Sequence, residues 1–343
     1  MPYILLYKNN TLHLFYEIIY QFKTLDSTMW LISLFLTSIL TFVELNCENL
    51  FDCQHDSLKL DTEYLPQGAK RWTPYRYWRK IDNIAKEIIS CGKDSCGYSL
   101  PDIVALCEVE NDSVMRDLTK RSALRTLHYD YLMTNSPDLR GIDVALMYHT
   151  YSFKPISHSC IRINPLKGMR PTRDILYVCG QIVSGDTLHI FVVHAPSRYG
   201  GERKTRPYRL AVVQQLNSTI DSIRCIQPTA KIIVAGDFND YSNSASIEYL
   251  KNCDLEEVSA NAQGKHVAKG SYYFKGKWEN IDHVFISPSL RHYWVTTYIH
   301  DMPFLLEEDT VFGIYKPFRT YQGYKYQEGG FSDHLPVVTR FAF

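Results

Sequence analysis

The sequence predicts one α/β domain, and three observations lead to this prediction. The chain has 343 residues, of which 45% are hydrophobic and 22% are charged, a composition typical of a globular protein with a substantial core. Short runs of β-branched and aromatic residues recur along it, and many are apolar nearly throughout, as strands in a covered sheet are. Stretches of helical periodicity lie between some of these runs.

Eight segments have the character of β-strands. They are residues 41–45, 102–107, 143–148, 175–183, 187–193, 231–235, 280–287 and 335–340. Several follow one another too closely in the chain for every connection to be a helical crossover. No internal repeat, low-complexity tract or linker interrupts the series, so one domain is the simplest interpretation.

Three helices are expected between the strands. Thr73 followed by Pro74 is typical of an N-cap and a first helical turn. Trp78, Ile81, Ile84, Ala85, Ile88 and Ile89 then fall on one face. A second helix is expected over 112–127 and a third over 207–226, with an apolar stripe formed by Leu210, Val213, Leu216, Ile220 and Ile223.

The N-terminal region contains the apolar run WLISLFLTSILTFV, residues 30–43. It is shorter than the about 20 residues that a membrane-spanning helix needs. A signal segment over 29–43 is the alternative, although no basic region precedes the run and no A-x-A site follows it. We expect residues 1–40 to be an extension and residues 41–343 to be the domain; location stays open between cytoplasmic and exported.

Charge and cysteine content exclude several classes of protein. The 37 basic and 37 acidic residues cancel, so polyanion binding would have to come from local patches. The nine cysteines form no paired CxxC sites or Cys/His cluster, which argues against both a disulfide framework and a structural zinc site.

Polar side chains stand at the ends of many predicted strands. They are Asn46, Glu48, Asn49, Glu108, His194, Asp237, Asn239, Asp282, Asp333 and His334. Ligand sites of α/β sheets gather where strands end, so these side chains are expected to converge. Taken singly, each also has a structural explanation, as a turn former, a helix start or a satisfied core histidine.

This set of residues suits metal-assisted hydrolysis of a phosphate ester. Mg²⁺ takes oxygen ligands from one or two carboxylates, with waters and substrate phosphate, and offsets charge in the transition state. An Asp or His would orient or deprotonate the attacking water. Neither a G-x-S-x-G motif nor a suitable cysteine environment is visible.

The series NCENLFD, PDIVALCEVEN, RGIDVALMY, PTRDILYV, HIFVVHAPSRYGGE, IIVAGDFND, ENIDHVFIS and GGFSDHLPV closely resembles the endonuclease/exonuclease/phosphatase superfamily, above all its bacterial branch, which is similar to the deoxyribonucleases around His194. The blocks appear in the family's order. The resemblance implies a four-layered α/β sandwich, with two mixed sheets packed face to face and helices outside. It also implies a phosphoesterase that depends on Mg²⁺ or Mn²⁺.

Catalytic roles follow from the resemblance, position by position. It implies that His194 lies against the scissile phosphate, that Asp237 aligns the water and that Asn239 donates to a phosphate oxygen. Asp282 is expected to orient His334, the final histidine of the SDH motif.

Metal and substrate roles follow in the same way. The resemblance implies that Glu108 and Asp333 bind metal and that Asn46 shapes the metal and phosphate site. Arg173 resembles an arginine that grips a phosphate oxygen. Glu48 stands where other branches have a second ligand, Asp or Asn, which leaves the number of metals open.

Two basic patches bear on the substrate. Residues 70–80, KRWTPYRYWRK, combine five basic residues with four aromatics, and a structural role is the favoured interpretation. Residues 198–209, RYGGERKTRPYR, directly follow His194, and we expect Arg203 and Arg206 to contact phosphate. The Tyr-rich loop 312–326 could stack bases or sugars, or only pack over the sheet.

The expected function is therefore a metal-dependent nuclease acting on DNA or RNA as a monomer, with no stable protein partner. A phosphatase or phosphodiesterase for a small or lipid phosphate is the alternative. The inositol-phosphatase signature is absent, because KWENIDH stands in its place. A binding module on the same scaffold is disfavoured, because each motif position keeps a chemically competent side chain.

Overall fold

The computed structural model describes residues 38–92 and 99–343, and Ser38–Phe343 form one compact unit. The predicted extension over 1–40, with the apolar run that could be a signal segment, therefore lies almost entirely outside the described residues. Its last residues enter the first strand, β1 (Ile39–Leu50). Within the described part of the chain, no helix has the length and apolar character needed to cross a membrane.

Two six-stranded mixed sheets form the centre of the molecule. The first has the order β13-β18-β1-β2-β4-β3. Its other strands are β2 (Ile103–Val109), β3 (Tyr129–Met133), β4 (Asp143–His149), β13 (Trp294–Ile299) and β18 (Val337–Ala342). Only β1 and β2 run parallel; the other neighbours are antiparallel.

The second sheet repeats this plan, with the order β5-β6-β7-β8-β12-β9. Its strands are β5 (Phe153–Ile161), β6 (Ile175–Ile182), β7 (Thr187–His194), β8 (Lys231–Asp237), β9 (Glu256–Glu257) and β12 (Asp282–Ile286). Here β7 and β8 form the single parallel pair. Each parallel pair lies inside its sheet, so its carboxyl ends face one edge together.

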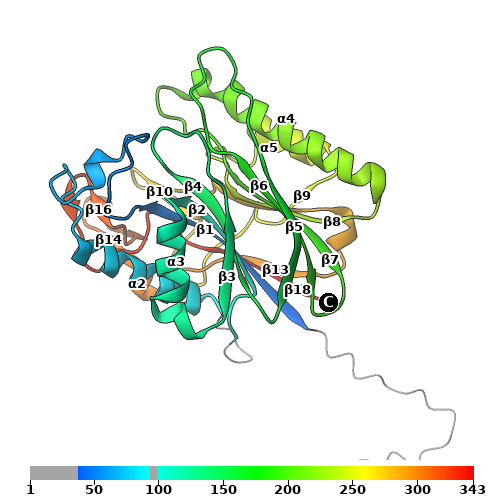
Figure 1. Cartoon of the computed structure of the whole chain (residues 1–343), viewed down its shortest axis with the longest axis horizontal. Helices are drawn as coiled ribbons and strands as arrows, with labels where there is room; N and C mark the ends of the chain where they lie inside the picture. The colour runs from blue at the N-terminus through cyan, green and yellow to red at the C-terminus, as the bar shows by residue number, and fades with distance from the viewer. Residues whose placement is uncertain (1–37, 93–98) are drawn as a thin grey trace, which may run out of the picture. The chain divides into compact units, whose positions relative to one another are not determined.

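Three hydrophobic cores define four layers. The first lies between the two sheets and joins Phe42 and Leu146 of one to Ile190 and Val284 of the other. The second packs the first sheet against α2 (Pro74–Ser90) and α3 (Asp112–Lys120). The third packs the second sheet against α4 (Glu202–Ile226) and α5 (Ala245–Asn252). Figure 1 shows the two helix pairs on opposite sides of the strands, which confirms the expected α/β sandwich.

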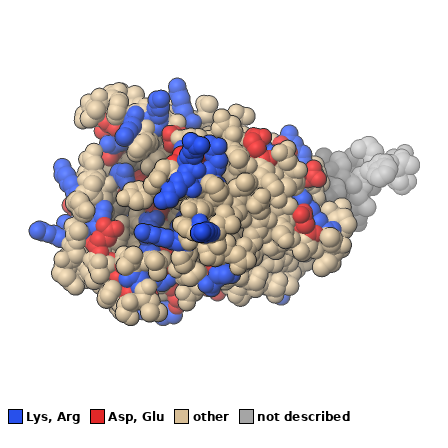
Figure 2. Space-filling view, turned by 90° about the horizontal axis from the view of Figure 1, so that it is seen from above, with Lys and Arg blue, Asp and Glu red and all other residues tan. Residues whose placement is uncertain are grey.

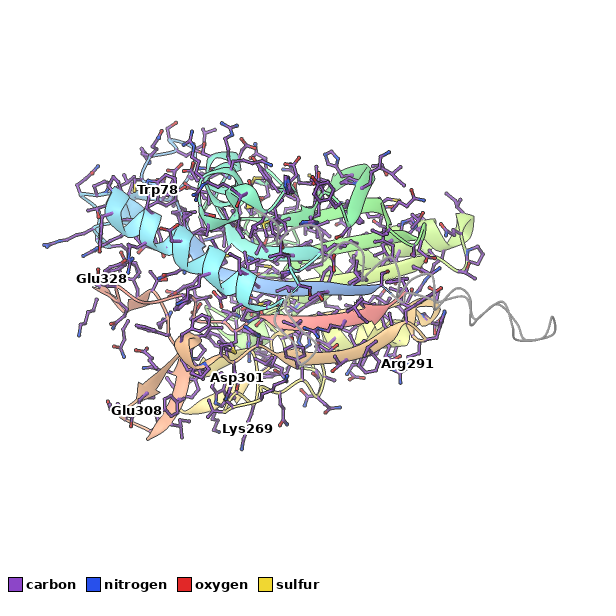
Figure 3. All side chains as sticks on the ribbon, turned by 90° about the horizontal axis from the view of Figure 1, so that it is seen from below. Trp78, Lys269, Arg291, Asp301, Glu308 and Glu328 are labelled. Atoms are coloured by element: carbon purple, nitrogen blue, oxygen red, sulfur yellow. The ribbon has the colours of Figure 1, made fainter. Side chains whose placement is uncertain are left out.

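Helix α2 begins as the sequence predicts, because the Thr73 side chain accepts from the Arg76 amide and Pro74 opens the helix. Its buried face was predicted incorrectly in one position. Tyr77 is the buried aromatic residue, whereas Trp78 lies at the edge of the stripe and is 36% exposed. Figure 3 labels Trp78 on this helix. Trp78 leans on the Tyr77 ring at a centroid distance of 5.4 Å.

The other two helices differ from the expected ranges at their ends. The predicted helix 112–127 is α3 followed by a separate 3-10 turn, Ala123–Thr126, because Ser122 caps a new turn through the Leu124 amide. The predicted helix 207–226 starts five residues earlier, at Glu202, so Pro207 lies inside it. Glu202 and Arg206 pair across the first turn at 2.9 Å, which supports the early start.

All eight predicted strands are present, but several others were missed. β3, β5 and β13 lie at or near sheet edges and expose many side chains, so their hydrophobic pattern is weak. The Tyr-rich segment 312–326 is not one loop: it contains β15 (Ile314–Pro317), β16 (Tyr321–Gln322) and β17 (Lys325–Tyr326). β15 pairs with β14 (Leu306–Asp309), and β10 (Tyr272–Phe274) pairs with β11 (Lys277–Glu279).

Gly236 is required where β7 and β8 approach most closely. Its φ is +145°, and an added Cβ would lie 1.8 Å from the Val193 carbonyl oxygen. Gly236→Ala should therefore lower the free energy of unfolding by at least about 3 kcal/mol, because it combines backbone strain with a clash. Gly185→Ala is the control: φ is +90° with nothing within 4 Å, so about 1 kcal/mol is expected. Equal losses in urea unfolding would contradict this account.

Candidate active site

The strand ends of both sheets meet at one place. Registers in the second sheet pair His194 of β7 and Asp282 of β12 with Asp237 of β8. β12 runs antiparallel to β8, so Asp282 begins its strand at the edge where β7 and β8 end. From the first sheet, β1 and β2 bring Asn46 and Glu108 to the same place.

Asp237 is the central carboxylate of this cluster and is buried. The Asn46 side-chain amide donates to its Oδ2 at 3.0 Å, and the Asn239 backbone amide donates to its Oδ1 at 2.8 Å. His194 Nε2 lies 3.6 Å from Oδ2. One oxygen of Asp237 is therefore fixed by the backbone, while the other faces Asn46 and His194.

His334 is held by Asp282 from the opposite sheet. Its Nδ1 lies 2.7 Å from Asp282 Oδ2, and both side chains are buried. The Tyr272 ring packs against the imidazole at a centroid distance of 4.8 Å. The bend at 332–334 gives the two neighbours different surroundings, because Asp333 contacts Arg319 rather than Asp282.

Oxygen and nitrogen atoms in this cluster are close enough to bind a cation. Asp237, Asp282 and His334 each place one ligand atom within 4.8 Å of the others. The Asp282–His334 hydrogen bond already uses one atom of each residue, however. The carboxylate of Glu108 is a harder ligand than the imidazole of His334. Its Oε2 accepts from the Asn49 amide at 2.8 Å, while its Oε1 lies 3.5 Å from Arg140 and 3.9 Å from His194.

Glu48 and Asp333 are bound together by protein cations. The Arg319 guanidinium lies 3.2 Å from Glu48 Oε1 and 2.9 Å from Asp333 Oδ2. The Thr320 amide occupies Glu48 Oε2, and the buried Lys80 ammonium lies 3.7 Å from it. Both oxygens of Glu48 thus have protein partners, which disfavours the expected role of Glu48 as a metal ligand. Asp333 Oδ1 lies 4.0 Å from His334 Nε2.

Three arginines expected to grip phosphate lie outside the main cluster. Arg173 is buried, and its guanidinium is held by Asp138 at 3.2 Å and by the Ala195 carbonyl at 2.6 Å. Arg206 pairs with Glu202 on the surface of α4, and Arg203 is exposed on the same helix. None of the three lines the catalytic cavity described below.

The pKa values of the two histidines are shifted in opposite directions. Burial alone would lower the pKa of His334, but Asp282, Asp333 and Asp237 outweigh it and hold that pKa well above its usual value. Burial lowers the pKa of His194 well below its usual value, and the positive charges of Arg173 and Arg140 add to this effect. His334 is therefore a cation near neutral pH, and His194 is a neutral imidazole.

The pKa of Asp237 is raised toward neutral pH. Burial, followed by the charge of Asp282, raises its pKa to about 7, against the opposing effects of His334 and the Asn239 amide. A carboxylate with such a pKa can accept a proton at physiological pH.

Four residues at the site have left-handed backbone conformations. Their φ angles are 50° at Glu48, 54° at Asn49, 61° at Glu108 and 52° at Asn239. Such angles are uncommon outside glycine and cluster at functional sites. Glu108 lies near the end of β2, and Asn239 follows the end of β8. At each position the left-handed conformation redirects a side chain that would otherwise alternate across the sheet.

A cavity of about 670 Å³ opens over the cluster. Glu108, His194, Asp237, Asn239, Asp333 and His334 line it, with Asn49 and Glu279. Among the lining residues that were not singled out from the sequence are Arg140, Arg198, Tyr199, Tyr241 and Tyr272. Arg140 lies in the RGIDVALMY motif and Arg198 in the second basic patch, so motif membership is the signal that could have identified them.

Comparison with known proteins identifies what the chain resembles. The sequence profile of the endonuclease/exonuclease/phosphatase family matches residues 41–342. No curated protein matches the chain in sequence. Among solved structures, a protein of the same family from Bacteroides thetaiotaomicron superposes with a TM-score of 0.60 at 15% identity, covering 89% of this chain and 98% of that one.

Two more structures share the fold. A mannosyl-6-phosphatase from Bacteroides thetaiotaomicron has a TM-score of 0.57 at 16% identity and covers 89% of this chain and 100% of its own. The human Nocturnin catalytic domain with bound sulfate has a TM-score of 0.54 at 17% identity, covering 89% and 94%. At these identities the likeness concerns the fold alone.

Asp282→Asn should move the alkaline limb of the pH–rate profile to lower pH. The raised pKa of His334 keeps its proton to higher pH, and the amide retains the hydrogen bond but removes the negative charge that holds the proton. A shift of about one to three pH units is expected. The surface change Asp130→Asn should leave the profile unchanged. An unaltered alkaline limb in Asp282→Asn would show that His334 does not act as a cation.

Proposed function

The chain belongs to the endonuclease/exonuclease/phosphatase family, and we propose on this basis that it is a metal-dependent phosphodiesterase that cleaves nucleic acid. The proposal extends the deoxyribonuclease-like likeness of the motif around His194. We propose that it acts as a monomer and needs no protein partner.

The main observation in favour of nucleic acid is the rim of the catalytic cavity. The Arg198 guanidinium stacks on the Tyr241 ring at 3.9 Å. Tyr199 is 93% exposed beside it, and Arg140 stands on the same rim. Arginine next to exposed aromatic rings suits a strand with a charged backbone and stackable bases.

The proposed chemistry is attack of water on phosphorus with rupture of one P–O ester bond. Asp237 accepts the proton of the water, since its pKa lies near 7 and the Asn239 amide holds its position. Cationic His334 donates to a phosphate oxygen as negative charge accumulates. Neutral His194, 3.6 Å from Asp237, orients the water or the phosphate.

The residues fit a hard divalent cation. Glu108 Oε1 and Asp333 Oδ1 belong to carboxylates that line the cavity. Oxygen donors of this kind suit Mg²⁺ or Mn²⁺, and Asn46 supports the site through Asp237. When bound, the ion would polarise the phosphoryl oxygen and offset developing charge.

A phosphatase for a small phosphate is the second candidate. Glu279 lies on the cavity rim, 3.5 Å from Arg198, and it shares the cavity with Glu108, Asp237 and Asp333. The negative charge of these carboxylates opposes the binding of a long polyanion more than the binding of a single phosphate. A lipid phosphate belongs to the same alternative.

Asp237→Asn and His334→Ala should each lower kcat by about 10²- to 10⁴-fold, because each removes a positioned proton-transfer or donor group. Thermal unfolding, measured in parallel, separates a chemical effect from loss of structure. Unchanged turnover in both folded variants would place the reaction elsewhere.

Metal dependence should be complete. EDTA should abolish hydrolysis and Mg²⁺ or Mn²⁺ should restore it. Glu108→Gln should move the Mg²⁺ titration to higher concentration, because one anionic ligand becomes neutral. Glu48→Gln is the comparison: both oxygens of Glu48 are bound by protein groups, so a smaller shift is expected. Full activity in EDTA would refute the metal requirement.

The substrate is tested by hydrolysis, with metal added, of duplex DNA, single-stranded DNA, RNA, sphingomyelin and sugar phosphates. The proposal expects turnover of a nucleic acid. Cleavage of only a sugar phosphate or a lipid would favour the second candidate and would leave the assignment of the catalytic residues standing.

A further inference from the structure

A second cavity, of about 360 Å³, adjoins the catalytic one. Arg140, Ser197 and Tyr199 line both, so the two cavities are direct neighbours. The remaining walls come from the segment between β5 and β6, from the start of α4 and from the loop that precedes β4. No residue of the catalytic cluster on Asp237 belongs to it.

Positive charge dominates this second cavity. Arg140, Arg170 and Lys204 line it, whereas Asp138 is the one acidic residue that does so. Asp138 is buried and is neutralised by Arg173 at 3.2 Å. Within the described residues, the side chains of Arg170 and Lys204 have no ion pair. Figure 2 shows Lys and Arg side chains gathered near the centre of one face of the molecule.

Two buried polar groups in this cavity lack partners. Arg173 Nε and Thr172 Oγ1 have no hydrogen-bond partner among the described residues. The side chains belong to residues only 7% and 5% exposed, and both residues line the cavity. Unsatisfied buried donors are uncommon in folded proteins and call for an explanation, such as a bound anion.

The start of α4 adds to the positive potential of the second cavity. Gly200, Lys204 and Thr205 line the cavity, so it borders the first turn of a 25-residue helix. The N-cap is Gly201, which has no side chain to satisfy the amides of that turn. The positive end of the helix dipole attracts anions.

Apolar side chains cover another part of the wall. Leu60, Leu139 and Met169 line the cavity, and Tyr199 and Tyr208 stand at its side toward α4. A phosphate needs only the cationic part, whereas a sugar or base attached to it would contact the apolar part. The catalytic cavity differs, because carboxylates and cations are mixed there: Glu108, Asp237, Glu279 and Asp333 face Arg140, Arg198 and His334.

We propose that the second cavity is a phosphate subsite, which binds an uncleaved phosphate and its nucleoside next to the scissile phosphate. The inference rests on the proposed nuclease function and refines it. The substrate would carry at least two phosphates, and a nucleic-acid strand supplies the second at the neighbouring nucleotide. Arg170, Lys204 and Thr172 would select such substrates over isolated monophosphates.

Binding without metal tests the subsite independently of catalysis. Calorimetric titration of the full chain with thymidine 5′-phosphate in EDTA should show binding, because the cations of the second cavity attract the anion without a bound metal. The double change Arg170→Ala and Lys204→Ala should weaken this binding at least tenfold. Lys154→Ala with Lys167→Ala removes the same charge from exposed positions outside both cavities and should leave it unchanged. Equal binding by the two double variants would overturn the subsite.

Cleavage of short substrates tests its role in the reaction. Thymidine dinucleotides with an extra phosphate at the 5′ or the 3′ end should be cleaved with a higher kcat/KM than the plain dinucleotide, at one of the two ends. Arg170→Ala with Lys204→Ala should remove this preference, and Thr172→Val should reduce it. A wild-type enzyme that cleaves all three dinucleotides equally would overturn the subsite but not the nuclease. Phosphate binding in EDTA that depends on Arg170 and Lys204, without cleavage of any nucleotide, would instead support the subsite and contradict the nuclease.

Discussion

Two hydrogen bonds between the sheets determine the geometry of the whole site. Asn46 of β1 donates to Asp237 at the end of β8, and Asp282 of β12 holds His334, which lies three residues before β18 begins. Each bond therefore joins one sheet to the other at the rim of their shared core. Small shifts of one sheet over the other would change both distances together, so the packing of Phe42 and its neighbours across the interface also fixes the catalytic distances.

Positive charges stabilise an unusually acidic edge. Glu48, Glu108, Asp237, Asp282 and Asp333 lie within one region, and their repulsion would oppose folding if nothing balanced it. Four protein cations are distributed among them: Arg140 at Glu108, Arg319 between Glu48 and Asp333, buried Lys80 behind Glu48, and His334 at Asp282. This division leaves Glu108 and Asp333 on the wall of the cavity and gives Glu48 a structural environment.

The sequence predicts the centre of the site better than its surroundings. Asp237, Asp282 and His334 were identifiable because they interrupt or end strongly apolar strands, where a buried charge is costly without a function. Arg319 and Lys80 were not, because Glu48, the carboxylate that they share, lies 271 residues from Arg319 in the chain and on a different element from Lys80. Glu44 lies in the predicted strand 41–45 and was not identified as a residue of interest. It is buried, and neither of its carboxylate oxygens has a hydrogen-bond partner among the described residues.

The same distinction holds for the fold. Central strands and the start of α2 follow from local patterns, since burial on both faces and an N-cap both leave short-range signals. The edge strands β3, β5 and β13 each pair with one strand only and expose many side chains, so their hydrophobic pattern is too weak to identify them. The role of Arg203 and Arg206 was inferred from proximity in sequence to His194, but the helix turns them to the surface.

The left-handed residues at the site limit how this chain could be stabilised. Glycine would relax the backbone at positions 48 and 108, but it would remove a carboxylate from each. At position 48 the exchange would leave Arg319 and the buried Lys80 without that partner, which is strongly destabilising. At position 108 it would take a carboxylate from the cavity wall. The ion pairs of the fold therefore retain the strained Glu48, whereas the strain at Glu108 keeps a carboxylate at the cavity.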